Sequence, residues 1–381
     1  LGNILNFDKL TNENIYVLES PILSNSQFEK FIKFFGKNSK TINCTFPSVT
    51  QKANLLQSLT MARFDRIEDL SQLYDRVMLR TPVLVQAPDG MGKTFLLHQL
   101  IEKLQGRRVC FYISLRGYTS FSQFLQDWVQ EFIRVSAHHS NLQYQLKRFL
   151  DEYGVQKLEH QGEIAQWCQS LTQMLGQVAL DFLFLFDDLD EWEVETSPEG
   201  LFELFGILSQ TRNIQLLFSV NPSLADQPPI ANLELYKLRG LQQEDIWPQG
   251  ASPEEQKAYE YSDGHSGMLL HILHYMQDTP EAGKAANRLM QELHPRFKLF
   301  KNRFTGLQWN LLRAIALEEK VAQPHAFDFL VKYRLGAASS VERALRNLID
   351  SGMISRSEEG WQLTHVVHKR WLQWLYSSSF N

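Results

Sequence analysis

The chain has 381 residues, of which 44% are hydrophobic and 21% charged, a composition typical of globular proteins with a substantial core. Its 38 basic and 43 acidic side chains give a net charge of −5, which excludes a wholly polybasic nucleic-acid binder. The longest apolar runs, such as 182–186, are far shorter than the roughly 20 residues of a membrane helix, so no membrane association is expected. Three widely spaced cysteines without metal-type spacing predict a reduced, cytoplasmic protein.

The N-terminal part of the chain differs in composition from the rest. No arginine precedes Arg63, and residues 1–62 contain eight asparagines, against nine in the remaining 319 residues. We therefore expect residues 1–48 to form a small N-terminal extension, to which the sequence assigns no role.

Strands and helices are predicted to alternate over residues 49–240. Residues 121–175 carry helical periodicity with breaks near 138–140 and 154, and a further helical stretch covers 241–300. Short apolar runs predict strands at 82–87, 108–115, 179–186, 214–220 and 233–238. This alternation predicts a three-layer α/β domain with a parallel sheet.

A glycine-rich loop, residues 87–94, lies between the first predicted strand and the next helix. It matches the GxxxxGK[ST] pattern except that Ala87 replaces the first glycine. Small residues let consecutive backbone N–H groups surround a phosphate, while Lys93 reaches the β- and γ-phosphates and Thr94 binds Mg²⁺. A glycine-rich turn that merely precedes a helix is the plainer alternative. The predicted nucleotide-binding residues are Pro88, Asp89, Gly90, Met91, Gly92, Lys93, Thr94 and Phe95.

The predicted strand at 179–186 is followed by a group of acids. A buried parallel strand presents such a carboxylate at the edge of the sheet where the phosphate loop also lies. Asp187 is expected to bind Mg²⁺ together with Thr94, and one of Asp188, Asp190 or Glu191 to polarise the attacking water. The residue types do not decide which acid is the base, although an aspartate at 188 in the role of a glutamate predicts slow hydrolysis.

Asn221 ends the predicted strand at 214–220. It is placed to contact the γ-phosphate or the water, and a turn-capping role before Pro222 is about equally supported. The predicted catalytic residues are Asp188, Glu191 and Asn221.

From about residue 60 to 376 the chain resembles the archaeal-type AAA+ and STAND (signal-transducing nucleotide-switch) ATPases. The resemblance rests on 64–70, similar to an F-x-x-R-x-x-E-L lead-in, on the phosphate loop, on LFLFDDLDEW at 183–192, and on 263–269. The last segment is similar to a G-G-N-P lid motif with Ser266 in place of proline. The resemblance implies an ASCE/AAA+-like P-loop NTPase core at 49–240 that binds ATP or ADP with Mg²⁺, followed by a helical lid at 241–300.

Residues 301–381 look like the winged helix that often closes this family. Three helical patterns are followed by two short strands at 353–356 and 359–363, and the segment carries 11 basic and 7 acidic groups. In one hypothesis Arg343 and Arg346 enter a DNA groove; in the other the winged helix folds back on the nucleotide domain. The resemblance then implies that His365 contacts an ADP phosphate. A solvated arginine face and an ordinary strand-end histidine are the plainer alternatives.

Three functions remain open at the level of sequence. The leading hypothesis is a slowly hydrolysing ATP-binding switch whose nucleotide state controls domain closure, with a protein partner or self-association. The second is a DNA-binding AAA+ ATPase of the initiator or transposition-regulator kind. The third is a scaffold with a purely structural nucleotide.

Overall fold

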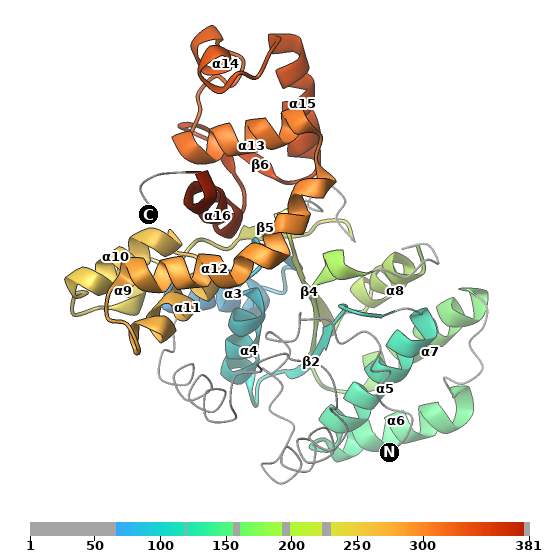
Figure 1. Cartoon of the computed structure of the whole chain (residues 1–381). Coiled ribbons are helices and arrows are strands. Elements are labelled where there is room, and N and C mark those ends of the chain that lie inside the picture. The colour runs from blue at the N-terminus through green and yellow to red at the C-terminus, as the bar shows by residue number, and fades with distance from the viewer. Residues whose placement is uncertain (1–65, 119, 155–160, 193–198, 223–229, 377–381) are drawn as a thin grey trace, which may run out of the picture. The chain divides into compact units, whose positions relative to one another are not determined.

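The computed structural model describes residues 66–118, 120–154, 161–192, 199–222 and 230–376 (Figure 1). The chain divides into two units, Leu1–Gln57 and Ser58–Asn381, and all described residues belong to the second unit. The predicted extension at 1–48 lies outside the described residues, as do the first two residues of the lead-in, Phe64 and Asp65.

A parallel sheet of five strands forms the centre of the first described domain, and it confirms the predicted α/β fold. The strands are β1 Val83–Gln86, β2 Val109–Ser114, β3 Phe182–Asp187, β4 Ile214–Val220 and β5 Glu234–Lys237. Their order in the sheet is β2-β3-β4-β1-β5, and every neighbouring pair is parallel. Because β4 lies between β1 and β3, side chains at the end of β4 stand between the phosphate loop and the acids that follow β3.

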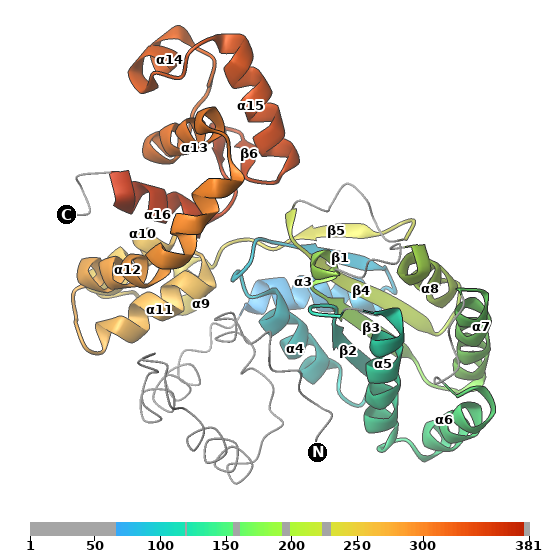
Figure 2. The same ribbon diagram turned by 45° about the vertical axis from the view of Figure 1, so that its right-hand side comes forward.

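Helices cover both faces of this sheet (Figures 1 and 2). The helices of this domain are α3 Ile67–Met78, α4 Lys93–Leu104, α5 Phe121–Ser136, α6 Ser140–Tyr153, α7 Gln161–Gln177 and α8 Glu199–Ser209. Helices α3 and α4 pack on one face, and α5 to α8 pack on the other.

Strand β3 shows why the apolar run was continuous rather than alternating. All six of its residues are buried, with the phenylalanines in the core under α5–α8 and the leucines in the core under α3 and α4. A strand buried on both faces has no polar side to present.

The remaining helices and a two-stranded wing follow the sheet. The elements are α9 Gln243–Ile246, α10 Pro253–Ser262, α11 Ser266–Met276, α12 Ala282–Phe300, α13 Gly306–Glu318, α14 Phe327–Tyr333, α15 Ala338–Asp350, β6 Ile354–Ser357, β7 Gly360–Leu363 and α16 Val366–Tyr376, with short 3₁₀ turns at Leu189–Glu191 (η4) and Lys301–Arg303 (η6). Strands β6 and β7 are antiparallel, as predicted for a wing, and Val321 adds a bridge to Trp361.

The lid and the winged helix share one hydrophobic core. Buried residues from Leu241 to Leu372 form a single cluster, in which Trp371 of α16 stacks edge-on against Phe297 of α12 at 5.4 Å between ring centroids. Packing therefore joins these two segments into one body, distinct from the two cores that flank the sheet.

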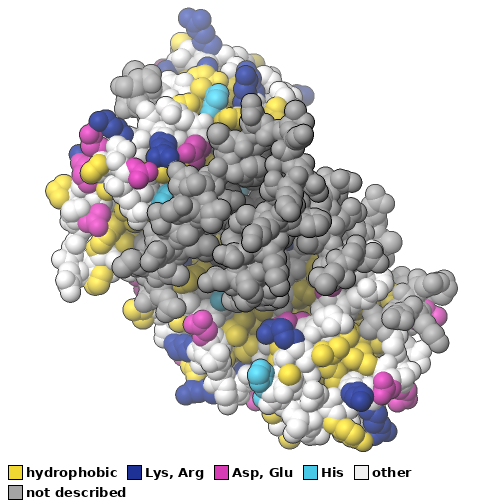
Figure 3. All heavy atoms as spheres, turned by 60° about the horizontal axis from the view of Figure 1, so that its bottom comes forward, with side chains coloured by type: hydrophobic (Ala, Val, Ile, Leu, Met, Phe, Trp, Pro, Cys, Tyr) yellow, Lys and Arg dark blue, Asp and Glu magenta, His cyan; other side chains and the backbone are white. Residues whose placement is uncertain are grey.

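None of the described helices combines the length and apolarity needed to cross a membrane. Among the described residues visible in Figure 3, acidic and basic side chains are interspersed over the surface. This distribution agrees with the modest net charge of the chain.

Candidate nucleotide-binding site

The loop between β1 and α4 depends on two glycines with left-handed backbone. Gly90 has φ 73° and Gly92, the N-cap of α4, has φ 86°. A Cβ at Gly90 would lie 2.5 Å from Cε1 of His265, so no other residue fits without displacing the lid. The loop therefore leads directly into the N-terminus of a helix, whose unpaired N–H groups favour a bound anion.

Ala87, the departure from the glycine pattern, continues the first strand. Its N–H donates to the carbonyl of Val220 at 3.2 Å, and it is not among the described residues with a positive φ. A methyl group is therefore accommodated at this position, because the turn itself is made by the two later glycines.

The Lys93 ammonium is held in place by oxygen acceptors from the phosphate loop and from Asn221. Its Nζ donates to the carbonyl oxygen of Ala87 at 2.7 Å and to Oδ1 of Asn221 at 2.8 Å, and it lies 3.8 Å from Oδ1 of Asp89. Lys93 is only 5% exposed. A buried ammonium with three donors, fixed at the start of a helix, is suited to bind phosphate oxygens.

Asp187 ends β3 and receives hydroxyl donors from three other elements. Thr94 Oγ1 donates to its Oδ2 at 2.6 Å, Tyr112 OH donates to the same oxygen at 2.9 Å, and Ser219 Oγ donates to Oδ1. Asp187 is fully buried. The structure thus brings together the two residues predicted to bind Mg²⁺, Thr94 and Asp187.

The chemistry of this pair fits Mg²⁺. Both groups offer oxygen, the ligand type that Mg²⁺ prefers. No cluster of three or more His, Cys, Asp or Glu suited to a metal occurs in the part of the chain that the structure describes. The pair of Thr94 and Asp187 therefore suits Mg²⁺, which keeps several waters and binds one or two protein groups together with phosphate oxygens.

Asp188 lies in a strained backbone conformation next to Asp187. Its φ of 56° belongs to the left-handed region, and its N–H donates to Ser219 Oγ at 3.1 Å. Its Oδ2 accepts from Ser114 Oγ at 3.0 Å and lies 3.6 Å from Nε of Arg116. Aspartate tolerates this region better than most side chains do, and the contacts with Ser219, Ser114 and Arg116 hold Asp188 in it.

Burial raises the pKa of the Asp188 carboxyl to about 6, and the neighbouring charge of Asp187 acts in the same direction. The positive charge of Arg116 and the hydrogen bond from Ser114 oppose this rise. A carboxyl with a pKa near neutrality can accept a proton and later release it, as a general base requires.

Asn221 joins Lys93 to a second acid. Its Nδ2 donates to Oδ2 of Asp190 at 2.5 Å, and its backbone N–H donates to Oδ1 of the same residue at 2.9 Å. Since Oδ1 of Asn221 accepts from Lys93, the orientation of the amide is fixed at both ends. The structure therefore places Asn221 on the phosphate-loop lysine, and Asp190 is its anchor.

Glu191 lies in η4, where its Oε1 is 3.9 Å from Nη2 of Arg116. Arg116 therefore stands between two of the three acids proposed as the base. The shorter approach is to Asp188.

The lid loop contacts the backbone of the phosphate loop. The N–H of Gly267 and the hydroxyl of Ser266 both donate to the carbonyl of Gly90, at 2.8 and 3.0 Å. His265 Nε2 lies 2.8 Å from the carbonyl oxygen of Asp89. The segment predicted as a lid motif is thus bonded to the loop that it was expected to cover.

Hydrogen bonding fixes the tautomer of His265. Its Nδ1 accepts from the backbone N–H of Met268 at 3.0 Å, so Nε2 carries the proton and donates to Asp89. Burial lowers the pKa of this imidazole to about 4, which keeps the ring neutral in this tautomer at physiological pH.

Helix α16 of the winged helix is fixed to the other side of the lid loop. Lys369 Nζ donates to Oδ2 of Asp263 at 2.6 Å. Arg370 donates to the carbonyl oxygens of Glu260 and Tyr261 at 2.7 and 3.0 Å, and so caps the C-terminus of α10. The lid loop therefore touches the phosphate loop on one side and the winged helix on the other.

His365, predicted to contact a phosphate, precedes α16. Burial lowers the pKa of its imidazole; the charge of Asp89 opposes this shift and that of Lys93 adds to it. Its ring meets that of His368 edge-on at 5.3 Å between centroids.

Arg66 is a buried residue that donates a hydrogen bond to the backbone of the phosphate loop. This arginine is 2% exposed and donates to the carbonyls of Met91 and Arg239 at 2.8 Å each, while pairing with Asp69 at 2.9 Å. It thereby joins the loop to the chain that leaves β5.

Sequence reasoning missed several side chains at this site. Their only local signal is a polar residue near the end of an apolar strand, or a histidine beside glycines. The residues are Tyr112, Ser114, Arg116, Ser219 and His265.

Comparisons with known proteins support the architecture. Residues 295–374 match the model of a probable winged helix domain, and residues 75–220 match that of the N-terminal region of nephrocystin 3. A Walker-type ATPase of Pyrococcus abyssi is 15% identical, with a TM-score of 0.57 over 81% of this chain and 96% of its own. The chain has a P-loop ATPase fold with a C-terminal winged helix.

Other solved structures resemble this P-loop ATPase fold less well. The Orc1 protein of Aeropyrum pernix, in complex with DNA, is 13% identical with a TM-score of 0.40, over 81% of this chain and 92% of its own. Cdc6p from Pyrobaculum aerophilum is 12% identical with a TM-score of 0.36, over 87% and 97%. No curated protein matches the sequence. At these levels of identity the likenesses concern the fold alone.

Proposed function

We propose that the protein is a slowly hydrolysing ATP-binding switch, whose nucleotide state controls how the lid and winged helix close on the nucleotide domain. One observation carries the proposal: the loop 263–267 is bonded to the phosphate loop through Gly90 and to α16 through Lys369. A change in the phosphates of the bound nucleotide could therefore be transmitted to the winged helix through this one loop.

The proposed nucleotide site uses the residues predicted from the sequence. Backbone N–H groups of residues 89–95 would surround the phosphates, with Pro88 at the start of the loop and Lys93 on the β- and γ-phosphates. Thr94 and Asp187 would hold Mg²⁺, which neutralises charge that develops on the phosphate oxygens. His365 is proposed to meet the phosphates from the winged helix.

Asp188 is the acid best suited to serve as the base. Its pKa of about 6 leaves it mostly ionised at pH 7, and Ser114 with Arg116 orients its carboxylate. It would accept one proton from the attacking water while Asn221 and Lys93 stabilise the charge on the phosphate. A short aspartate held by an arginine has little freedom to approach the water, so turnover is expected to be slow.

The shared core determines what moves in this switch. Because lid and winged helix pack into one cluster, opening would separate both together from the phosphate loop. The bonds that break are those of His265, Ser266 and Gly267 to the loop backbone. The new state would expose a surface for a protein partner or for a second copy of the chain.

The nucleotide content of the purified full-length chain tests the switch. Near-stoichiometric ADP, released by acid and identified by chromatography, is expected, together with an exchange half-life of minutes or longer. A site that is empty and exchanges freely would contradict a closed, slowly exchanging switch. Retained nucleotide with no turnover under any condition would instead favour the scaffold function.

DNA binding is a second candidate function, favoured by the surface of α15. Ser340, Arg343, Arg346 and Asn347 are exposed along this helix, and Arg356 lies on the wing with its guanidinium 5.7 Å from the Trp361 ring centroid. An exposed third helix beside a wing is the arrangement with which helix-turn-helix proteins enter the major groove. Arg346 also pairs with Glu342, which reduces its free charge.

Duplex binding at two salt concentrations tests this candidate. Binding that weakens with salt and is lost in the Arg343→Ala/Arg346→Ala variant would support it. Arg148→Ala, an exposed arginine on α6, is the matched control.

A further inference from the structure

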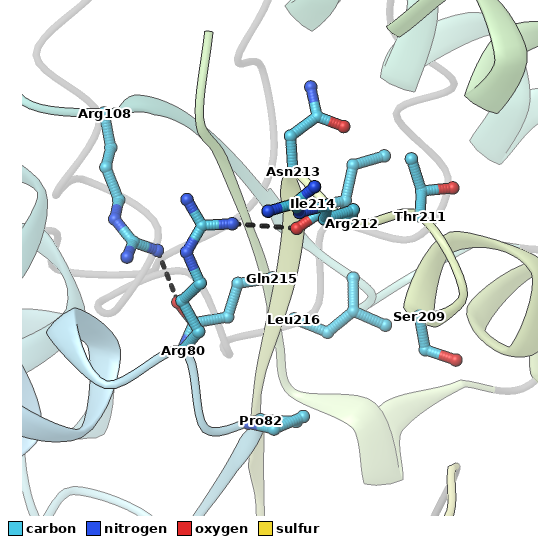
Figure 4. Close-up of a pocket in the computed structure, with 10 residues that line it drawn as sticks. All are labelled: Arg80, Pro82, Arg108, Ser209, Thr211, Arg212, Asn213, Ile214, Gln215 and Leu216. Atoms are coloured by element: carbon cyan, nitrogen blue, oxygen red, sulfur yellow. Dashed lines mark hydrogen bonds between the residues drawn. The ribbon is translucent and has the colours of Figure 1, made fainter. Parts of the chain in front are cut away.

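A second pocket, of about 180 Å³, lies at the amino-terminal edge of the sheet. It is lined by residues that precede β1 and β2, by the start of β4 and by the turn after α8 (Figure 4). The nucleotide site described above lies at the opposite, carboxyl edge of the sheet and in the lid and winged helix. The two sites are therefore separated by the length of the strands.

Three arginines from different segments line this pocket: Arg80, Arg108 and Arg212. Figure 4 shows the guanidinium groups of Arg80 and Arg108 side by side. Among the residues that the structure describes, no carboxylate lines the pocket, and the carboxylate that pairs with Arg80 is Asp181, at 2.6 Å. The three arginines and this acid leave two positive charges without a counter-charge.

The hydrogen bonds of these arginines leave donors available for a ligand. Arg80 donates to the carbonyl of Arg212 at 2.8 Å, and Arg108 donates to Oε1 of Gln215. The guanidinium of Arg212 makes no hydrogen bond or ion pair with another residue in the described ranges. Each guanidinium carries five N–H donors, so most of them remain free.

Arg80 occupies a backbone position that favours glycine. Its φ is 60°, and the N–H of Thr81 donates to the carbonyl of Arg76 at 3.1 Å, which is the glycine-type ending of a helix. A long side chain in this left-handed position carries a backbone cost. From this position the guanidinium donates to both the carboxylate of Asp181 and the carbonyl of Arg212.

The neighbouring positive charges of Arg80 and Arg108 oppose one another. Burial lowers the pKa of the Arg108 guanidinium; Asp181 opposes this, and the charge of Arg80 lowers it further. An anion beside Arg108 would offset both effects. The hydroxyls of Ser209 and Thr211 and the amide of Asn213 also line the pocket and add uncharged polar groups.

We propose that this pocket binds a small phosphate group, held by Arg80, Arg108 and Arg212 at the edge of the sheet opposite the nucleotide. Planar guanidinium groups bind tetrahedral oxyanions through paired, charge-assisted hydrogen bonds. The pocket is large enough for inorganic phosphate or for the terminal phosphate of a small ester. This site does not depend on the proposed switch function.

Calorimetric titration of inorganic phosphate into the full-length chain tests the proposal. Saturable binding is expected, and Arg212→Ala should weaken it roughly tenfold because one charged partner is lost. Arg212 is exposed, so this variant is expected to keep the fold, which the melting temperature checks. Arg212→Lys should keep part of the affinity, since it keeps the charge but not the planar fork.

Two control variants locate the bound phosphate. Arg148→Ala, on the surface of α6, should leave the titration unchanged. Lys93→Ala removes any phosphate bound at the phosphate loop, and the saturable binding that remains should still be weakened by Arg212→Ala. Absence of saturable binding, loss only in Lys93→Ala, or equal loss in Arg148→Ala and Arg212→Ala would each overturn the proposal. Methyl phosphate distinguishes the sources: tighter binding than phosphate, still dependent on Arg212, assigns the pocket to a phosphate ester, and weaker binding assigns it to the free ion.

Discussion

The two edges of the parallel sheet use different means to attract an anion. At the carboxyl edge the phosphate loop and the first turn of α4 supply backbone N–H groups, and a single lysine, Lys93, completes the site. At the amino edge helices α3 and α8 end rather than begin, so arginine side chains must supply the positive charge.

This difference determines how each site depends on sequence. A site built from backbone depends on glycines such as Gly90, whose conformation no other residue adopts without strain. A site built from side chains depends on residues far apart in the chain, here at positions 80, 108 and 212. Variants at one edge should therefore leave the function of the other edge intact.

The largest expected effect concerns the base. Asp188→Asn should lower ATP turnover roughly a hundred- to a thousandfold, because the amide cannot accept a proton from water. Nucleotide affinity should change little, since the loop and Lys93 are untouched. Phosphate release and nucleotide titration measure the two quantities. If Glu191→Gln has the larger effect, the base is Glu191.

Lys93→Ala tests the carboxyl edge itself. Affinity for Mg-ATP should fall roughly 10- to 100-fold, because the lysine supplies charged hydrogen bonds to the phosphates. Arg212→Ala, at the amino edge, should leave this affinity unchanged. Fluorescent nucleotide titration measures both variants, and an equal loss in the two would contradict the independence of the edges.

The pH dependence of turnover sharpens the assignment of Asp188. Its pKa is raised to about 6, so the ionised base is lost as the pH falls below that value. Turnover at saturating ATP should decrease about tenfold for each pH unit below 6. The inflection should vanish in Asp188→Asn; a profile that stays flat from pH 5 to 8 in the parent chain would argue against this base.

The smallest expected effect concerns the connection to the winged helix. Lys369→Ala removes a partly buried ion pair with Asp263 and should speed ADP release roughly threefold. Lys332→Ala removes the ion pair with Glu318, away from the lid loop, and serves as the control. Displacement of a fluorescent ADP analogue measures release, and equal rates in the two variants would remove Lys369 from the proposed path.

The parts of the site that the sequence predicted are those encoded in one segment. Lys93 and Thr94 lie in a contiguous loop, and Asp187 ends a run of apolar residues that could only be a buried strand. The strand order was not encoded in this way. Since β4 lies between β1 and β3, Asn221 reaches Lys93, 128 positions away, and no local pattern shows that contact.

The contacts of the lid and the arginine pocket were harder still to predict. His265 acts through its ring tautomer, which depends on the N–H of Met268 and the carbonyl of Asp89. The three pocket arginines are adjacent only because the chain repeatedly returns to the amino edge of the sheet. For these residues the sequence shows which chemical groups are available, and only the fold shows which partners they contact.

Gly264 gives the molecule a single position at which lid docking can be removed without altering any residue that faces nucleotide. Its φ is 72°, and a Cβ there would lie 2.6 Å from the carbonyl oxygen of Leu241. Gly264→Ala would therefore force the lid loop away from the chain that leaves β5, while the phosphate loop keeps its sequence. The substitution would strain the turn that carries His265, Ser266 and Gly267 to the phosphate loop, so the contacts of the lid with that loop could be weakened while the residues of the proposed nucleotide site stay as they are.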